Sequence, residues 1–365
     1  MWPCDPHTLA KHDLLRLYLQ SWLPTLLHGG WPGVTYAEGF AGAGVYSGGQ
    51  PGSPIIALDV FLGQRALLAA GKRVDMVLVE ERNDRMQQLK HQVGLALARQ
   101  RERPRSLQQP IYRHGDSATE LLPGLAVCPP KQPVFAFLDS FGGPDIPFEV
   151  VQAIARRRAS EVLITFSPRF LTRFGERDIH RDAGNRAFGG THWQNVFEQP
   201  SDQKKRYLVT AYRTSLNKAG FGYVVSFEML DETGNDLHLV FGTSSPEGLA
   251  KMKNAMWQVD PVSGLRYRDP RDPDQTELAL ALEPNTAPLR RAVLGQLNKK
   301  DLTLDELRRY ALLETIYRRE HVQPAVLQLL KSEQIERVTK KGRLTGSSRL
   351  RLAPQKGDYE VPTLF

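Results

Sequence analysis

The chain has 365 residues, of which 41% are hydrophobic and 24% are charged, a balance that excludes a disordered chain, a collagen-like fibre and a disulfide-framed miniprotein. Residues 289–365 carry 16 basic and 9 acidic side chains, so nearly all of the net charge of +8 lies in the last fifth, which favours a polyanionic partner such as nucleic acid over a merely solvated tail. We expect a cytoplasmic protein, because no membrane span or signal peptide is evident and the two cysteines, Cys4 and Cys128, lack metal-site spacing.

The first half of the chain alternates strands with helices. An amphipathic helix is predicted over 8–27, and Ser53-Pro54 is a favourable start for the next helix because proline suits the first helical position. Further helices are expected over 84–99 and 147–157. The segment 74–79 is typical of a buried parallel strand, and further strands are expected at 34–37, 111–114, 134–138 and 161–166.

The segment 168–206 is expected to be irregular, polar and rich in arginine. It is followed by a predicted helix over 203–218, a hairpin of strands 223–230 and 237–243, and a helix over 246–257. Five strand–helix alternations followed by a hairpin predict an α/β domain over 1–257, with a parallel sheet that has an antiparallel end.

The C-terminal part differs in pattern. Residues 258–288 are proline-rich and predict a linker. Helices are expected over 289–297 and 323–332, and between them a further helix is expected to begin at Thr303, which would cap it. A hairpin of strands 335–338 and 349–352 is expected to follow. Three helices and a hairpin with a basic tip predict a winged-helix-like domain over 289–365; the tip contains Lys340, Lys341 and Arg343.

A glycine-rich turn follows the first predicted strand. Gly42 and Gly44 would let the backbone approach a ligand closely, because glycine has no Cβ. A dinucleotide fingerprint would need a third glycine where Ser47 stands, so the pattern does not favour NAD. An acidic residue just before the turn, Glu38, suits S-adenosylmethionine, whose ammonium group a carboxylate can contact directly or through water.

Three further carboxylates follow the next strands in chain order. Glu80 can accept hydrogen bonds from ribose hydroxyls, and Asp116 from an adenine amino group, while Asp139 follows the fourth strand. A single carboxylate at a strand end is common and can be purely structural. Four in order predict a ligand site at the carboxyl edge of the sheet.

The candidate acceptor segment is Asp139-Ser140-Phe141-Gly142. Enzymes that methylate exocyclic amines have a short Asp/Asn-Pro-Pro-aromatic turn here, in which the acid accepts from the amine and the aromatic ring stacks on the base. Asp139 and Phe141 can fill those roles, while Ser140 replaces the proline. The alternative is an ordinary turn with Phe141 in the core.

Arginines and aromatic residues alternate within 168–206, beginning with Arg169, Phe170, Arg173 and Phe174. Such interleaving suits a nucleic acid strand with unstacked bases, and a long insertion suits a lid over substrate. The alternative is a surface excursion with its own small core. His180 and His192 lack ligand partners at metal spacing, so no metal site is expected.

Together these motifs resemble the three-Cys-motif partner protein (TcmP) family, and the resemblance covers nearly the whole chain. The residues that carry it are Lys11, His12, Leu15, Tyr18, Phe40-Ala41-Gly42-Ala43-Gly44, Gly52-Ser53-Pro54, Glu80, Asp139-Ser140-Phe141-Gly142, Gly248 and Met256-Trp257. The family usually has proline where this chain has Ser140. The resemblance implies a Rossmann-like class I methyltransferase fold and a radical-SAM-like partner that carries the three-cysteine motif.

The sequence therefore predicts an S-adenosylmethionine-dependent methyltransferase that acts on a nucleic acid base, with an exocyclic amine favoured. The expected roles are cofactor binding by Glu38, Phe40, Gly42, Gly44, Glu80 and Asp116, catalysis by Asp139 and Phe141, and substrate binding by Ser140, Arg169, Arg173, Lys340, Lys341 and Arg343. Two alternatives remain open. One is a catalytically silent nucleic-acid-binding or scaffold subunit that serves the partner, and the other is an enzyme that methylates a small molecule or a protein.

Overall fold

The computed structural model describes residues 3–4, 6–64, 71–100, 104–230, 236–261, 263–264, 266–268, 284–339 and 342–354. The chain divides into two compact units, Met1–Ala281 and Leu282–Phe365, and the boundary falls in the proline-rich segment. Among the helices formed by the described residues, none combines the length and the apolar character needed to cross a bilayer.

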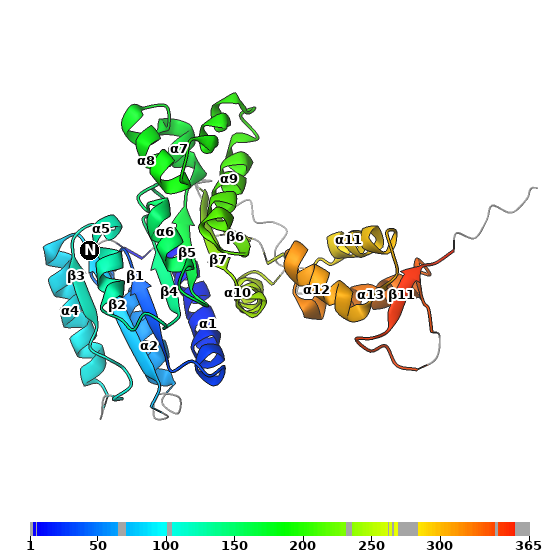
Figure 1. Ribbon diagram of the computed structural model, residues 1–365, viewed down its shortest axis with the longest axis horizontal. Helices are drawn as coiled ribbons and strands as arrows, with labels where there is room; N and C mark the ends of the chain where they lie inside the picture. Colours follow the sequence, from blue (N-terminus) through cyan, green and yellow to red (C-terminus); the bar gives the residue numbers. More distant parts are fainter. Residues whose placement is uncertain are drawn as a thin grey trace, which may run out of the picture. The chain divides into compact units, whose positions relative to one another are not determined.

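The first unit is built around one mostly parallel sheet (Figure 1). Its strands are β1 (Gly33–Glu38), β2 (Arg73–Glu80), β3 (Ile111–His114), β4 (Val134–Leu138), β5 (Glu161–Phe166), β6 (Tyr223–Leu230), β7 (Asp236–Thr243) and β8 (Arg266–Arg268). They lie in the order β3-β2-β1-β4-β5-β7-β6-β8, and only β7 runs antiparallel to its neighbours. This confirms the predicted parallel sheet with an antiparallel hairpin at its end.

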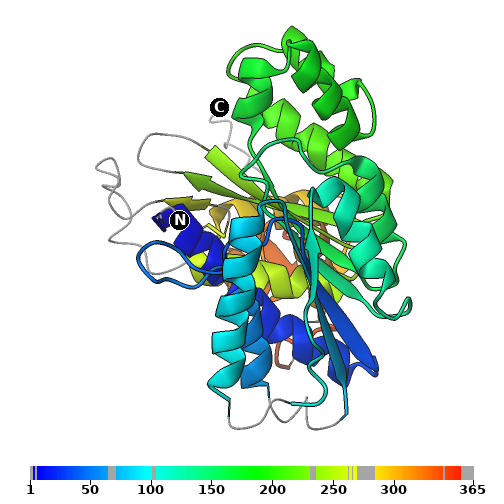
Figure 2. The ribbon, with the colours of Figure 1, turned by 90° about the vertical axis from the view of Figure 1, so that its left-hand side faces the viewer.

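Helices cover both faces of this sheet (Figure 2). One face is covered by α1 (Pro6–His28), α2 (Ser53–Gly63), α4 (Asn83–Ala98) and α10 (Pro246–Val259). The other is covered by α5 (Ser117–Ala126), α6 (Phe148–Ala155) and α9 (Lys204–Ala219). Because both faces are covered, β1, β4 and β5 are buried along their whole length, including the polar residues of β1 and β5.

The prediction that 168–206 is irregular is wrong. The segment forms α7 (Pro168–Phe174), α8 (Asp178–Phe188) and the 3-10 helix η1 (His192–Glu198). Trp193 is fully buried, and a Cβ on Gly184 would come within 2.4 Å of its ring. The Trp193 indole N–H donates to Asn185 Oδ1 at 3.0 Å. Leu171, Phe188 and Trp193 belong to the same hydrophobic core as the residues of β4, β5 and α9, so the insertion packs on the main sheet and the alternative of a separate small core is wrong.

The second unit contains the three predicted helices, α11 (Ala287–Leu297), α12 (Leu304–Glu314) and α13 (Val322–Lys331). The predicted hairpin is β10 (Ile335–Arg337) with β11 (Arg349–Leu352), and β9 (Leu302–Thr303) adds a third strand, in the order β10-β11-β9. In the predicted basic tip, Arg343 is exposed, whereas Lys340 and Lys341 lie outside the described residues.

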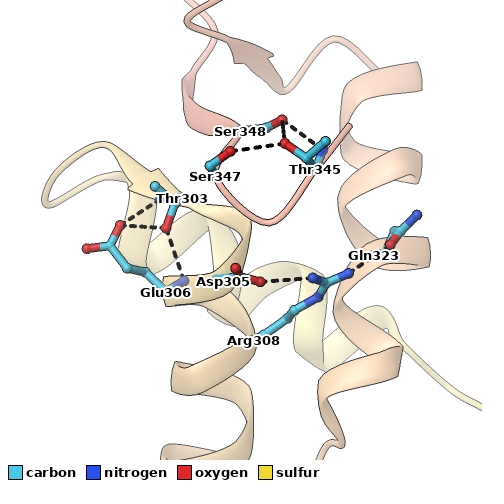
Figure 3. Close-up of polar contacts among 8 residues, drawn as sticks. All are labelled: Thr303, Asp305, Glu306, Arg308, Gln323, Thr345, Ser347 and Ser348. Carbon is cyan, nitrogen blue, oxygen red and sulfur yellow. Dashed lines mark hydrogen bonds and ion pairs between the residues drawn. The ribbon is translucent and has the colours of Figure 1, made fainter. Parts of the chain in front are cut away.

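The start of α12 is fixed by a capping box (Figure 3). The Thr303 hydroxyl accepts from the Glu306 backbone N–H at 3.2 Å, and the Glu306 carboxylate accepts from the Thr303 N–H at 2.7 Å. These hydrogen bonds hold the pKa of Glu306 below its ordinary value. Arg308 then links α12 to α13 through a 2.8 Å bond to Gln323. The cap predicted from the sequence therefore begins the helix that organises this unit.

We expect Thr303→Ala to loosen the first turn of α12 by about 1 kcal/mol, because the Glu306 N–H loses its acceptor. Amide hydrogen exchange in this turn should then accelerate by about fivefold, as measured by mass spectrometry of peptides from the whole protein. Ser347→Ala, in the neighbouring loop, is the matched control and should leave the exchange of α12 unchanged. Equal exchange in Thr303→Ala and the wild type would show that the cap does not stabilise the helix.

Candidate active site

A cavity of about 490 Å³ lies at the carboxyl ends of β1, β2, β3 and β4. Its volume is within the range of small-molecule sites, about 300–1,000 Å³. The strand order changes direction between β1 and β4, and open α/β sheets bind ligands at such a switch point. The lining residues are 39–46, 52–53, 80–82, 84–85, 88, 115–117, 139–141 and 145.

Most of the site residues predicted from the sequence meet in this cavity: Phe40, Gly42, Gly44, Glu80, Asp116, Asp139, Ser140 and Phe141 all line it. Glu38 is not among the lining residues, nor are Arg169 and Arg173, which lie on α7. Arg343 belongs to the second unit. The structure thus gathers the predicted cofactor and acceptor residues other than Glu38 at the cavity, whereas Arg169 and Arg173 are not among its lining residues.

The glycine turn after β1 wraps around the carboxylate of Glu80. Gly42 and Gly44 have φ values of +64° and +72°, in the left-handed region that favours glycine. The Gly42 N–H donates to Glu80 Oε2 at 2.9 Å, and the Arg82 N–H donates to Glu80 Oε1 at 2.9 Å. A Cβ on Gly42 would meet no atom within 4 Å, so the backbone here borders open space in which a ligand could lie.

Asp116 has a structural role as well as a place in the cavity. It caps α5, and its Oδ1 accepts from the Ala118 N–H at 3.1 Å. Asp145 lies nearby, and its pKa is raised by partial burial and by the negative charges of Asp116 and Glu81. This side of the cavity is therefore electronegative, and a cationic ligand would relieve the repulsion.

Glu38 is fully buried beside the cavity. It accepts a short hydrogen bond from the Tyr36 hydroxyl and a 2.7 Å bond from Ser53, which lines the cavity. Burial raises the pKa of Glu38 to about 8, so this carboxyl is neutral at pH 7. The structure thus gives Glu38 the task of joining β1 to α2, and the predicted contact with an ammonium group stays a prediction.

The turn after β4 presents an exposed aromatic ring. Phe141 is 67% exposed, so the alternative that places it in the core is wrong. Its φ of +57° is strained for a bulky residue, and such strain clusters at functional sites. The Ser140 hydroxyl donates to the Gly143 carbonyl at 2.8 Å, and the Ser167 N–H to the Gly142 carbonyl at 3.0 Å. These two hydrogen bonds hold the turn in place.

Lys11 is a site residue to which the sequence reasoning assigned no role. It lies on α1, is 4% exposed, and forms an ion pair with Asp139 Oδ2. The neighbouring His12 ring lies 5.6 Å from the ring of Tyr46, which lines the cavity. A signal was present, because helical spacing places Lys11 on the same face as the apolar residues Leu14, Leu15 and Tyr18.

Among the residues that the structure describes, no group of three or more histidine, cysteine, aspartate or glutamate side chains could hold a metal ion. His192 instead approaches Ser215, with 3.2 Å between Nε2 and Oγ, and burial lowers its pKa.

No family model matches the chain, and no curated protein matches it in sequence. Solved structures that it resembles include a precorrin-6y C5,15-methyltransferase from Geobacter metallireducens (13% identity, 63% of this chain and 87% of that chain, TM-score 0.33). Another is the O-methyltransferase TomG from Streptomyces achromogenes in complex with SAM (16% identity, 64% of this chain and 80% of that chain, TM-score 0.35). A third is the cyclopropane synthase MmaA2 from Mycobacterium tuberculosis (10% identity, 69% of this chain and 69% of that chain, TM-score 0.31).

At such scores these likenesses are loose, and the fold assignment rests on the sheet itself. The order β3-β2-β1-β4-β5-β7-β6, with β7 alone reversed, is that of a doubly wound, Rossmann-like sheet, to which β8 adds one edge strand. The expected Rossmann-like parallel sheet with an antiparallel end is therefore confirmed. The resemblance to the TcmP family has no support from a family model and stays a prediction.

We expect Glu38→Gln to change how stability depends on pH. Folded Glu38 keeps its proton up to about pH 8, whereas an unfolded glutamate loses it near 4.5. The native state therefore binds the extra proton between these values, and its stability falls as the pH rises through this window. As the pH rises through this window, the free energy of unfolding of the wild type should fall relative to that of Glu38→Gln by on the order of 4 kcal/mol, at about 1.4 kcal/mol per pH unit.

Urea unfolding of both proteins between pH 5 and pH 9 measures this difference. Glu149→Gln, an exposed position in the first turn of α6, is the control and should run parallel to the wild type. Parallel curves for Glu38→Gln and the wild type would mean that Glu38 is ionised in the folded protein.

Proposed function

We propose that this protein is an S-adenosylmethionine-dependent methyltransferase that acts on a nucleic acid base, with an exocyclic amine as the favoured acceptor. One observation carries the proposal. The carboxyl ends of four adjacent strands bring a glycine turn, Glu80, Asp116 and the strained Phe141 turn to a single cavity.

The order of the strands in the sheet suggests which part of the ligand each strand end would bind. Asp116 after β3 suits the adenine amino group, and Glu80 after β2 suits the ribose hydroxyls. The glycine turn after β1 suits the methionine end, since its backbone borders open space at Gly42. The next strand in the sheet is β4, so the transferable methyl group would face Asp139 and Phe141.

The charges of the lining residues fit this ligand. Six carboxylates border the cavity, against two arginines, Arg82 and Arg85. Arg82 is itself paired with Asp84 at 2.7 Å. S-adenosylmethionine carries a sulfonium and an ammonium group, so an electronegative cavity attracts its positive charges.

The residues of this chain would act by orientation. When bound, S-adenosylmethionine supplies a sulfonium methyl group, which an amine nitrogen takes with its lone pair while the carbon–sulfur pair stays on sulfur and the amine proton passes to water. The Phe141 ring offers a flat surface for a base, and Asp139 accepts a hydrogen bond from the amine. Alignment of this kind can supply much of the acceleration without covalent help.

Basic side chains support a nucleic acid as the substrate. On α7, Arg169 and Arg173 are exposed, and the Arg173 guanidinium lies 5.5 Å from the centre of the Phe174 ring. Cations beside aromatic rings suit single strands with unstacked bases. The second unit, which we interpret as a winged helix, adds a basic excess and the exposed Arg343. A radical-SAM-like partner stays a prediction from the family resemblance.

We expect purified protein to bind S-adenosylmethionine and S-adenosylhomocysteine with micromolar affinity, as measured by titration calorimetry. Glu80→Gln should weaken both by about 1–3 kcal/mol, because a charged acceptor of buried hydrogen bonds is lost. The exposed Glu149→Gln is again the matched control and should bind as the wild type does. A folded wild type that binds neither ligand would contradict the proposed enzyme activity and favour the alternative of a catalytically silent scaffold subunit.

We expect the protein to bind a mixed-sequence single-stranded RNA of about 20 nucleotides in a salt-dependent way. Replacing Arg169 and Arg173 together by alanine should lower the slope of log K against log salt by about 1.4, since each single-strand phosphate contact contributes about 0.7. Fluorescence anisotropy at several salt concentrations gives the slope. Arg16→Ala, on α1 and paired with Asp13, is the control. An unchanged slope in the double variant would exclude α7 from the contact surface.

A further inference from the structure

The buried pair Lys11–Asp139 has no part in the function proposed above beyond the role of Asp139. The side chains of Lys11 and Asp139 are 5% and 13% exposed. The Lys11 ammonium also lies 5.9 Å from the centre of the Phe141 ring. One lysine of α1 therefore contacts both of the residues that the sequence assigned to catalysis.

Stability alone is a weak reason for such a pair. Removing two charges from water is costly, and buried ion pairs can often be replaced by apolar side chains without loss of stability. The third titratable group nearby, Glu38, is neutral at pH 7 because burial raises its pKa to about 8. Lys11 forms its ion pair with Asp139, and its charge also lowers the pKa of Glu38 slightly against the larger effect of burial.

The pair divides the two oxygens of Asp139 between different tasks. Oδ2 is bound to Lys11. Oδ1 accepts a long bond of 3.4 Å from the Phe141 N–H, and a carboxylate oxygen can accept a second hydrogen bond. Asp139 lines the cavity, so this remaining capacity lies next to the exposed ring of Phe141.

We propose that Lys11 is the positioning residue of the acceptor subsite: its ammonium fixes the Asp139 carboxylate by one oxygen, reserves the other for an N–H of the acceptor, and offsets the negative charge beside the transferable methyl group. The proposal rests on the function proposed above. Lys11 acts through Asp139, and its positive charge sets the affinity of the subsite for a cationic group.

The ratio of two ligand affinities tests this role. S-adenosylhomocysteine has a neutral sulfur, whereas sinefungin has an amino-bearing carbon where the methylated sulfur stands. Sinefungin therefore places a cation at the methyl position, and its affinity relative to S-adenosylhomocysteine measures the charge of the subsite. Titration calorimetry of the full chain with both ligands gives the ratio.

In Lys11→Met the Asp139 carboxylate loses its partner, so the preference for sinefungin should rise by about tenfold or more over the wild type. Lys11→Arg keeps the charge and should stay within about threefold. In Asp139→Asn the ammonium of Lys11 is unpaired, and the preference should fall by about tenfold. Lys11→Met should then have little further effect when added to Asp139→Asn, because the two side chains form one unit.

Arg16→Met is the matched control, since Arg16 lies on the same helix, is 43% exposed and pairs with Asp13. It should leave the ratio unchanged. If Lys11→Met does not fold, the fall expected in Asp139→Asn decides the question. An unchanged ratio in the variants, with S-adenosylhomocysteine still bound, overturns the role of Lys11. A wild type that binds neither ligand overturns the proposed function instead.

Discussion

The parallel pairing of β1 with both β2 and β4 is the constraint on which the rest of the structure depends. Because the strands run in the same direction, the residues that follow them emerge at one edge of the sheet. Because β4 lies beside β1 and not beside β3, the chain reverses its progress across the sheet there and leaves a crevice. The glycine turn, Glu80, Asp116 and the Phe141 turn face one cavity for this reason.

The same edge concentrates negative charge, and each carboxylate there is stabilised in a different way. Glu80 accepts two backbone N–H groups, Glu38 is neutral because it is fully buried, and Asp139 is paired with a buried lysine. Partial burial raises the pKa of Asp145, and the negative charges of Asp116 and Glu81 raise it further. The arrangement leaves a net negative cavity, which suits a cationic cofactor better than a nucleotide phosphate.

The insertion after β5 is connected to the acceptor turn by the backbone. The Ser167 N–H donates to the Gly142 carbonyl, and α7 begins at the next residue, so the strained Phe141 turn and the arginine-bearing helix share one attachment. A Cβ on Gly142 would come within 2.7 Å of the Ser167 side chain, which shows how closely the two segments approach. The conformation of the Phe141 turn therefore depends on the backbone that begins α7.

The sequence by itself determined the strand–helix order, the glycine turn and the carboxylates at the strand ends, because these depend on local periodicity and on where each strand stops. It did not reveal the helices of 168–206, since the burial of Trp193 depends on how Gly175, Gly184, Phe188 and Phe197 pack around its ring. Nor did it place Lys11 beside Asp139, 128 residues away. Such pairings, and the neutral state of Glu38, were decided by the tertiary structure alone, because long-range packing removes water from groups that local sequence leaves exposed.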